Sequence, residues 1–366
     1  MQKNKIKVYL QYPWKFPDSP YYKYLLQNSP KEVQYLNIQN QKGVITSKRF
    51  FWVSNFLKKN IRKFTRILYP SMLNIHLSPQ GNYDLIHCAH CLSKNNNKPW
   101  IFDIEAFWQF WVSTKETKKG LKKVEKILNR ENCKKILPWT EKMKNELIES
   151  FPKLKEKIEL VYPAIPPKKI KKKIGKDITL IFSGRYFYWK GGLHALEAIN
   201  RLTKKYPNVR GIINSEVPEE IKQRYSKNEK IEFYGLIPQK KLFELYEKSD
   251  ILVYPGYTDS FGFAYLESMS FGIPVITVDG WSRKEILTEG KTGFVLDRPK
   301  NFKWNKIGKE EEVLINKMIE KIEKLIKNKK LRKKMSENCI KEIEKGKFSI
   351  KDRNKKLKRI YEEVLK

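Results

Sequence analysis

Short, continuously apolar runs alternate with longer helical patterns along the 366 residues of the chain. The apolar runs are rich in β-branched side chains, which is typical of strands buried on both faces of a parallel sheet. They are KIKVYL, YDLIHCA, KPWIFDI and KKILPW in the first half, and ITLIFSG, VRGIIN, KIEFYG, DILVYP and PVITV in the second. Helical patterns lie between them, and the chain from Glu310 onward is expected to be helical throughout. This alternation predicts an α/β fold with helices on both faces of its sheets.

A segment rich in proline and lysine divides the chain. Residues 163–177, PAIPPKKIKKKIGKD, have few apolar side chains and are predicted to be an exposed linker. We therefore expect an N-terminal domain over residues 1–165, joined by a C-terminal helix at 347–366, and a second domain over residues 178–346. Open parallel sheets bind ligands at the carboxyl ends of their strands, so a cleft between the two domains is the expected site.

The chain is strongly basic, with 76 Lys and Arg against 40 Asp and Glu and a net charge of +36. Residues 1–176 carry +23 of this charge, from 36 basic and 13 acidic side chains, and residues 177–366 carry +13, from 40 and 27. Such an excess predicts an anionic partner: a phosphate ester, nucleic acid, an acidic polymer or an anionic membrane surface. The chain has no apolar run long enough to cross a membrane, no secretion signal in MQKNKIKVYL, and only four cysteines. We therefore expect a cytoplasmic location.

Two cysteines and two histidines interleave in the sequence HCAHC, at Cys88, Cys91, His87 and His90. A structural zinc site needs four ligands, and no second pair of this kind completes the set. The simpler interpretation is that small and polar residues close a strand. Nucleic acid is not expected as a partner either, because no zinc-finger, homeodomain or RNA-recognition signature is present.

A possible phosphate site lies where the strand ITLIFSG ends and the next helix begins. Gly184 and Arg185 follow the strand, and Lys190 precedes the helix that opens near Gly191 and Gly192. Backbone N–H groups at a helix start, together with a guanidinium and an ammonium group, can hold a phosphate or diphosphate. A glycine turn with two solvated cations is the alternative, because such turns are common in this architecture.

A pair of carboxylates follows the strand DILVYP. Asp259 lies before a predicted helix, and Glu267 lies eight positions later on its second turn. A carboxylate in a basic cleft suits a sugar, since it can accept two hydrogen bonds from neighbouring hydroxyls. The alternative is that Asp259 caps the helix and Glu267 is an ordinary surface charge.

Taken together, these two segments resemble the C-terminal domain of the retaining GT-B glycosyltransferases of family 4, also called glycosyltransferase group 1. The strand-end Gly-Arg and the later Lys-Gly match the family's diphosphate-binding motif. Asp259 to Glu267 is similar to its E-x7-E motif with Phe-Gly inside, although Asp replaces the first Glu. The resemblance covers roughly residues 178–297. It implies the GT-B fold: two Rossmann-like parallel-sheet domains that face each other across a cleft.

The resemblance also implies roles for individual residues. Arg185 and Lys190 would bind the donor diphosphate, Asp259 the transferred sugar and Glu267 the ribose. The further donor-binding residues that it implies are Gly184, Ile237, Gly262, Phe263 and Ala264.

The expected reaction is the transfer of a hexose or N-acetylhexosamine from a nucleotide-diphosphate sugar to a hydroxyl group of a glycan, a lipid-linked acceptor or a small molecule. The resemblance implies retention, no metal and no cofactor beyond the donor. An inverting enzyme would need a base, for which His90, Asp103 and Glu105 are candidates on the acceptor side. Asp103 and Glu105 also resemble a D-x-D metal motif, but hydrogen bonding at a strand end is the simpler interpretation.

The first half resembles the family's acceptor domain only loosely, through YDLIHCAH and KPWIFDIEAF. Residues 48–68 form a basic amphipathic pattern, in which one predicted helical face carries Phe50, Val53, Leu57, Phe64 and Leu68. This pattern fits either a helix packed on the core or a peripheral helix on anionic lipid, as in cell-envelope glycan biosynthesis at the inner face of a membrane. Two rival functions remain: a GT-B epimerase or phosphorylase, and a non-enzymatic binder of an anionic polymer.

Overall fold

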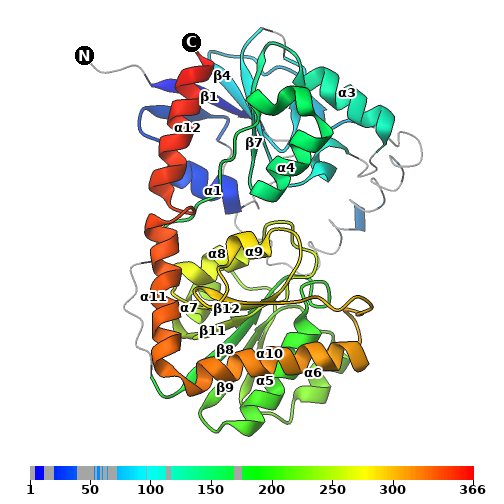
Figure 1. Cartoon of the computed structure of the whole chain (residues 1–366), viewed down its shortest axis with the longest axis vertical. Helices are drawn as coiled ribbons and strands as arrows, with labels where there is room; N and C mark the ends of the chain where they lie inside the picture. The colour runs from blue at the N-terminus through cyan, green and yellow to red at the C-terminus, as the bar shows by residue number, and fades with distance from the viewer. Residues whose placement is uncertain are drawn as a thin grey trace. The chain divides into compact units, whose positions relative to one another are not determined.

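The structure is a computed structural model that describes residues 5–11, 20–38, 72–95, 97–112, 117–168 and 175–366, together with Val53, Phe56, Leu57, Asn60 and Phe64. Its contacts divide the chain into two compact units (Figure 1). Unit 1 contains the described residues up to Ala164 and also Lys347–Lys366. Unit 2 contains the described residues of Ile165–Gly346.

Unit 1 is built on a parallel sheet of five strands in the order β2-β1-β4-β6-β7. These strands are β1 (Ile6–Gln11), β2 (Val33–Leu36), β4 (Leu85–Ala89), β6 (Trp100–Ile104) and β7 (Cys133–Pro138). A separate pair joins β3 (Ile75–His76) to β5 (Leu92–Ser93). The helices are α1 (Pro20–Gln27), α3 (Lys118–Leu128), α4 (Glu141–Ser150) and α12 (Ile350–Val364), with 3-10 turns at Phe107–Phe110 and Pro152–Lys157. Every residue of the central strands β4 and β6 is buried, as a sheet covered on both faces requires.

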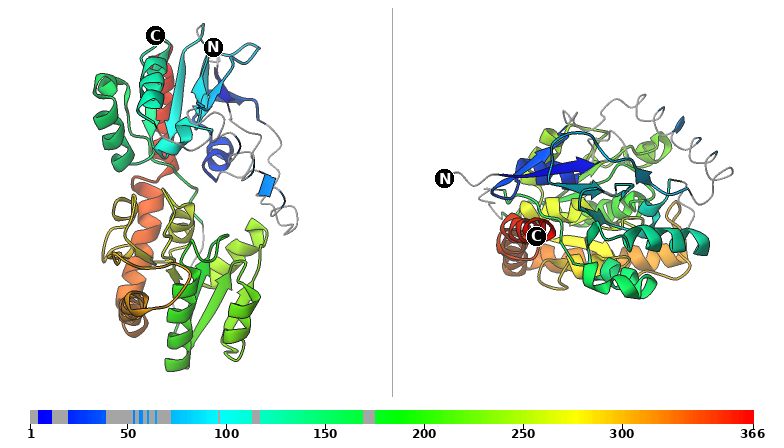
Figure 2. Two further views of the ribbon diagram at one scale, coloured as in Figure 1. Left: turned by 90° about the vertical axis from the view of Figure 1, so that its right-hand side faces the viewer. Right: turned by 90° about the horizontal axis from the view of Figure 1, so that it is seen from above.

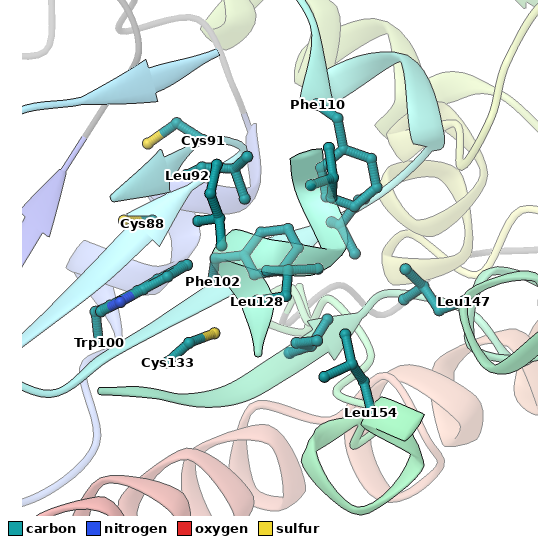
Figure 3. Packing of buried hydrophobic residues seen from close by; sticks show 14 of the residues in the cluster. Cys88, Cys91, Leu92, Trp100, Phe102, Phe110, Leu128, Cys133, Leu147 and Leu154 are labelled. Atoms are coloured by element: carbon teal, nitrogen blue, oxygen red, sulfur yellow. The ribbon is translucent and has the colours of Figure 1, made fainter. Parts of the chain in front are cut away.

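The core of unit 1 gathers aromatic and aliphatic side chains from β4, β6, α3 and α4. Figure 3 shows Trp100, Phe102 and Phe110 packed with Leu128 and Leu147. The cysteines of the core, Cys88, Cys91 and Cys133, are free thiols. Burial raises the pKa of the Cys88 and Cys133 thiols, so these two behave as small apolar groups.

Helix α12 follows unit 2 in the chain but packs on unit 1 beside β7 (Figures 1 and 2). Ser349 caps its first turn by accepting a hydrogen bond from the Asp352 N–H. The buried Arg353 donates to the Asn28 carbonyl at 2.7 Å and to the Ala164 carbonyl at 3.4 Å. The charged side chain thus anchors α12 to the end of α1 and to the segment that follows the 3-10 turn at Pro152–Lys157.

Unit 2 is built on a parallel sheet of six strands in the order β10-β9-β8-β11-β12-β13. The strands are β8 (Ile178–Ser183), β9 (Val209–Asn214), β10 (Ile231–Tyr234), β11 (Ile251–Val253), β12 (Val275–Val278) and β13 (Gly293–Leu296). The helices are α5 (Gly192–Lys205), α6 (Glu219–Tyr225), α7 (Gln239–Lys248), α8 (Phe263–Ser270), α9 (Arg283–Ile286), α10 (Lys309–Lys327) and α11 (Lys329–Lys345). Helix α5 packs beside α10, and α8 packs beside α11. The strand order reverses between β8 and β11, which defines the switch point where such sheets bind ligands.

The nine strands expected from the sequence are all present. The tail from Glu310 is helical over nearly its whole length, as expected, and it consists of three helices that are separated at Asn328 and near Gly346. Asn328 ends α10 and caps α11 with its side chain, which accepts a hydrogen bond from the Leu331 N–H. Within the described part of the chain, no helix combines the length and the apolar character needed to span a membrane.

Candidate active site

The switch point of unit 2 brings together the loops that follow β8 and β11. Gly191 ends the first loop with a φ of +82°, and a Cβ at this position would lie 2.5 Å from the Pro255 Cβ in the second loop. The Gly256 N–H donates to the Lys190 carbonyl at 2.9 Å and joins the same two loops. Glycine is required at position 191 because the two backbones meet there.

Two residues predicted to act together, Lys190 and Asp259, form an ion pair across this junction. Their side chains are 17% and 12% exposed, so the pair is largely shielded from water. Tyr254 lies beside it, and burial together with the Asp259 charge raises the pKa of the Tyr254 hydroxyl. The hydroxyl therefore keeps its proton and can donate to the carboxylate.

Arg185 and Gly184 lie at the carboxyl end of β8, where the sequence predicts them. Arg185 is half-buried. The turn after β9 supports this position: the Ser215 hydroxyl donates to the Gly184 carbonyl at 2.5 Å, and the Asn214 amide donates to the Ser183 hydroxyl at 2.9 Å. Asn214 and Ser215 thus hold the start of the loop that carries Arg185.

Helix α8 begins immediately after the loop that carries Asp259. Gly262 is its N-cap residue with a φ of +84°, and Phe263 and Ala264 are its half-buried first residues. The backbone N–H groups of a first helical turn lack intrahelical partners and favour an anion. The expected donor-binding residues Gly262, Phe263 and Ala264 therefore form one helix start at the switch point.

Glu267 lies on α8 and is 8% exposed. Its Oε1 accepts a hydrogen bond from the Gln239 amide at 3.2 Å. Gln239 is the first residue of α7, and the half-buried Ile237 lies two positions before it. One hydrogen bond thus connects the carboxylate predicted to hold a ribose with the segment predicted to hold the base.

Arg283, the first residue of α9, is an important residue that the sequence pattern did not indicate. Its guanidinium is buried and donates to the Tyr265 hydroxyl at 3.1 Å, to the Asp259 carbonyl at 3.3 Å, and to the carbonyls of Gly256 and Gly280. Burial raises the pKa of Tyr265 to about 12, although the Arg283 charge opposes this. Arg283 therefore fixes the loop around Asp259 to the loop that follows β12.

His194 lies near the start of α5 and is also buried. Its Nε2 donates to the Lys306 carbonyl at 3.0 Å, so its Nδ1 accepts the hydrogen bond that the Tyr257 hydroxyl makes at 2.6 Å. Burial lowers the pKa of the ring. The residue is therefore a neutral structural support for the loop after β11.

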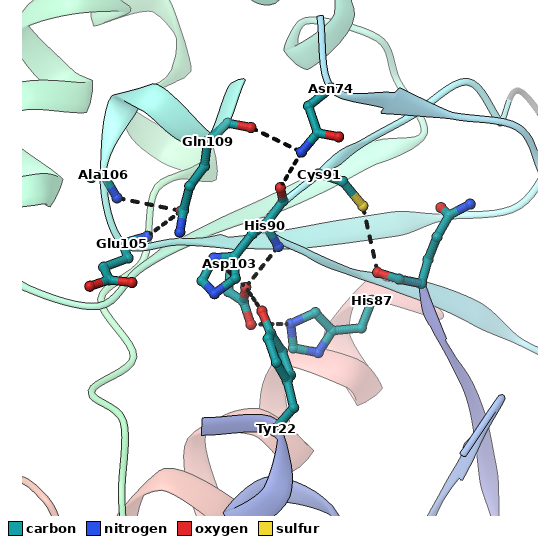
Figure 4. A network of polar contacts seen from close by, with 10 residues as sticks. Tyr22, Asn74, His87, His90, Cys91, Asp103, Glu105, Ala106 and Gln109 are labelled. Carbon is teal, nitrogen blue, oxygen red and sulfur yellow. Dashed lines mark hydrogen bonds and ion pairs between the residues drawn. The ribbon is translucent and has the colours of Figure 1, made fainter. Parts of the chain in front are cut away.

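In unit 1, Asp103 is the centre of a buried polar network (Figure 4). Its carboxylate accepts hydrogen bonds from the Tyr22 hydroxyl at 2.5 Å and from the His87 Nε2 at 3.1 Å. The His87 Nδ1 meets the Tyr361 hydroxyl of α12 at 2.8 Å. Asp103 has no exposed surface, so in this conformation it positions its neighbours and does not itself contact an acceptor.

His90 follows β4 at the switch point of the unit 1 sheet, between β1 and β4. It has a φ of +57°, its N–H donates to Asp103 at 3.3 Å, and its Nδ1 lies 3.6 Å from the same carboxylate. Its ring packs edge-on against Tyr22 and Trp139. Glu105 is half-buried, and its carboxylate points away from this network (Figure 4). Of the three acceptor-side candidates, His90 and Asp103 are together and Glu105 is apart.

The interleaved cysteines and histidines do not share one site. The Cys88 and Cys91 thiols donate to Gln11 at 3.3 and 3.5 Å inside the core. Among the residues that the structure describes, no group of three or more His, Cys, Asp or Glu side chains is arranged to hold a metal ion.

The basic amphipathic segment 48–68 lies mostly outside the described residues, as does the middle of the expected linker at 163–177. Five residues of the amphipathic segment are described, and all five are helical: Val53, Phe56, Leu57, Asn60 and Phe64. The four apolar ones are at least half exposed, which argues against the interpretation that they face a core.

Comparison with known proteins shows what unit 2 is similar to. Residues 166–342, just under half of the chain, match the family model "Glycosyl transferases group 1". A 41.2 kDa protein of the cps region of Klebsiella pneumoniae is 29% identical over 156 residues, 39% of this chain and 42% of that protein. The gpi3 subunit of the phosphatidylinositol N-acetylglucosaminyltransferase of Schizosaccharomyces pombe is 26% identical over 128 residues, 33% of this chain and 28% of that protein. The chain thus spans less than half the length of these relatives.

A glycosyltransferase structure from Rickettsia africae matches nearly the whole chain. The TM-score is 0.63, and the match covers 99% of each chain at 17% sequence identity. At this identity the match supports the fold, and it agrees with the two parallel-sheet units. The expected GT-B fold is confirmed, and residues 166–342 are similar to the group 1 glycosyltransferases.

Proposed function

We propose that this chain transfers a hexose or N-acetylhexosamine from a nucleotide-diphosphate sugar to a hydroxyl acceptor, with retention and without a metal ion. The observation that carries the proposal is the meeting of Lys190, Asp259 and the start of α8 at the switch point of unit 2. Two kinds of group lie together there: positive groups that can bind a diphosphate, and a carboxylate that can accept hydrogen bonds from sugar hydroxyls. The group 1 family match over the same residues supports this assignment.

The proposed role of the cations is to stabilise the leaving group. When the bond between the sugar C1 and the phosphate oxygen breaks, negative charge accumulates on the diphosphate. Arg185, Lys190 and the N–H groups at the start of α8 supply positive charge where it is needed. Each charge-assisted hydrogen bond contributes about 1.5–3 kcal/mol, so the loss of one slows the reaction tenfold or more.

The proposed role of the carboxylates is to orient the donor. Asp259 accepts hydrogen bonds from the sugar hydroxyls, and Glu267 accepts them from the ribose. The unliganded pair of Lys190 with Asp259 must separate before both residues can bind the donor. Donor binding therefore exchanges one internal ion pair for two contacts with substrate, one to phosphate and one to sugar.

Retention removes the need for a protein base, because a donor phosphate oxygen can take the acceptor proton on the leaving-group face. Nuclear magnetic resonance of the product's anomeric proton distinguishes retention from inversion at the sugar C1. An inverted product would refute this part of the proposal and direct attention to His90, whose Nδ1 lies near Asp103.

Thermal-shift screening of the full chain against UDP-, GDP- and ADP-sugars tests the core of the proposal. A ligand at one hundred times its dissociation constant adds about 2.7 kcal/mol of stability. The variant Arg185→Ala must weaken the shift produced by the active donor. The absence of a shift with every nucleotide sugar would refute the assignment.

The acceptor is proposed to be lipid-linked and presented at the inner face of a membrane. The exposed apolar residues Val53, Phe56, Leu57 and Phe64 and the charge of +23 on residues 1–176 support this, because such a surface attracts anionic lipid. The relative in Schizosaccharomyces pombe is named for a phosphatidylinositol acceptor. Co-sedimentation with phosphatidylglycerol vesicles at low salt tests the idea, and Phe56→Ser with Phe64→Ser must reduce binding. Equal binding by the double variant would contradict it.

A further inference from the structure

Three large aromatic side chains are exposed on loops at the carboxyl edge of the unit 2 sheet. Tyr186 and Trp189, in the loop after β8, are 40% and 53% exposed, and Trp281, in the loop after β12, is 50% exposed. Large aromatic rings are usually buried, because burial removes much apolar surface from water. Three such rings at one sheet edge indicate a surface that receives a ligand.

The first two rings lie close together. The ring centroids of Tyr186 and Trp189 are 5.7 Å apart, and their planes differ by 36°. The two residues lie between Arg185 and Lys190 in the sequence, so the loop that carries the proposed diphosphate-binding cations also carries this aromatic pair.

Trp281 has an unfavourable backbone conformation. Its φ is +49°, in the left-handed region that favours glycine and is rare for a bulky residue. Its half-exposed ring gains less from packing than a buried one would, so packing is a weak reason for this conformation. Residues held in such conformations cluster at functional sites.

Hydrogen bonds join the loops of the two tryptophans to the segment that carries Asp259. The Thr258 hydroxyl donates to the Trp189 carbonyl at 3.5 Å. The Ser282 hydroxyl, next to Trp281, donates to the Ser260 carbonyl at 2.7 Å. Thr258 and Ser260 are the immediate neighbours of Asp259, so both aromatic loops contact the segment whose carboxylate is proposed to hold the transferred sugar.

We propose that Tyr186, Trp189 and Trp281 form a saccharide subsite that binds a pyranose ring of the acceptor. One face of a pyranose carries C–H groups that pack on an aromatic ring, while its hydroxyls remain free to make hydrogen bonds. This inference rests on the proposed function for the identity of the acceptor, but the binding of a saccharide to these rings does not require turnover.

The test uses the full chain and a panel of methyl glycosides of glucose, galactose, mannose and N-acetylglucosamine. Saturation-transfer NMR, with irradiation of the aromatic protons, detects a glycoside that packs on the rings. The variants are Trp189→Ala and Trp281→Gly, and the matched control is Trp304→Ala, which removes a 44%-exposed tryptophan of the same unit outside these loops. We expect each test variant to weaken glycoside binding about tenfold and the control to bind as wild type does.

Trp281→Gly separates function from folding. Glycine adopts the left-handed conformation without strain, so this variant should melt no lower than wild type while it binds the glycoside more weakly. The thermal shift with the nucleotide sugar should be unchanged in both test variants.

The outcomes are distinguishable. Glycoside binding that persists unchanged in both variants, or that is absent with every glycoside in wild type, would overturn the subsite. A protein that binds glycosides through these rings but shows no shift with any nucleotide sugar would retain the subsite and refute the proposed function.

Discussion

Removing the charge of Asp259 should tighten the binding of a sugar-free nucleoside diphosphate. In the unliganded protein, Asp259 holds Lys190 in an ion pair, so a diphosphate has to compete with the carboxylate for the ammonium group. The variant Asp259→Asn keeps the shape of the side chain but ends this competition. It should also lower kcat with the nucleotide sugar, because the proposed contact with the sugar hydroxyls is weakened.

The size of the effect follows from the shielding of the pair. Two unit charges about 4 Å apart attract by about 4 kcal/mol at an effective dielectric constant of 20, and desolvation and side-chain ordering offset most of this. Fully exposed pairs contribute at most about 1 kcal/mol. Lys190 and Asp259 are only 17% and 12% exposed. We therefore expect the variant to bind the nucleoside diphosphate more tightly by about 1–2 kcal/mol, which is roughly a five- to thirtyfold lower dissociation constant.

Isothermal titration calorimetry with UDP and GDP at fixed ionic strength measures this change. The matched control is Asp279→Asn, which removes a negative charge at the same sheet edge but leaves the pair of Lys190 with Asp259 intact; it breaks the 2.7 Å ion pair of Asp279 with Lys284, which keeps Asp297 at 3.7 Å. Unchanged or weaker binding by Asp259→Asn would refute the reasoning. Equal tightening in both variants would show a general effect of charge and not the release of Lys190.

Three further predictions concern the groups around this pair. Arg185→Lys should lower kcat/KM at least tenfold in steady-state assays, because an ammonium cannot reproduce the planar fork of the guanidinium; wild-type kinetics would contradict a role in diphosphate binding. Arg283→Met should lower the free energy of unfolding in urea by about 3 kcal/mol, because it removes a buried guanidinium that donates to the Tyr265 hydroxyl and to backbone carbonyls of two loops. A loss below 1 kcal/mol would argue that water replaces the guanidinium. His194 has a lowered pKa in the folded state, so the unfolded state binds its proton first as the pH falls through about 6.5. Stability from this residue is therefore complete above that pH and lost below it by up to about 1.4 kcal/mol per pH unit, and urea titrations of His194→Gln should lack this component.

The sequence predicted the central strands and the loops of unit 2 because their signals are local. A buried strand followed by Gly-Arg, or by Asp and a helix, is visible within about ten residues. Of the described strands that were not predicted, β2 and β13 are four-residue strands at sheet edges, where a short apolar run does not distinguish strand from loop, and β3 and β5 have only two residues each. The break at Asn328 was visible as a capping residue, but the Lys- and Glu-rich pattern on both sides obscured it.

The supporting residues could not be predicted, since their partners are distant in the chain. Arg283 lies in SRKE, which is typical of an exposed helix start, and only the fold buries it against Gly256 and Asp259. Asp103 was predicted to face an acceptor, yet its oxygens belong to a network that continues through His87 to Tyr361, 274 positions beyond His87. No pattern within one segment indicates a contact of that kind.

The attachment of α12 to unit 1 sets an order of events during translation. The residues that complete unit 1, including Arg353 and Tyr361, leave the ribosome only after all of unit 2 has been made. Domains usually mature in the order in which they are synthesised, but here the later one can finish first. Until α12 has been synthesised, the nascent first half exposes the surface that α12 will cover. We expect chaperones to bind this surface during that interval.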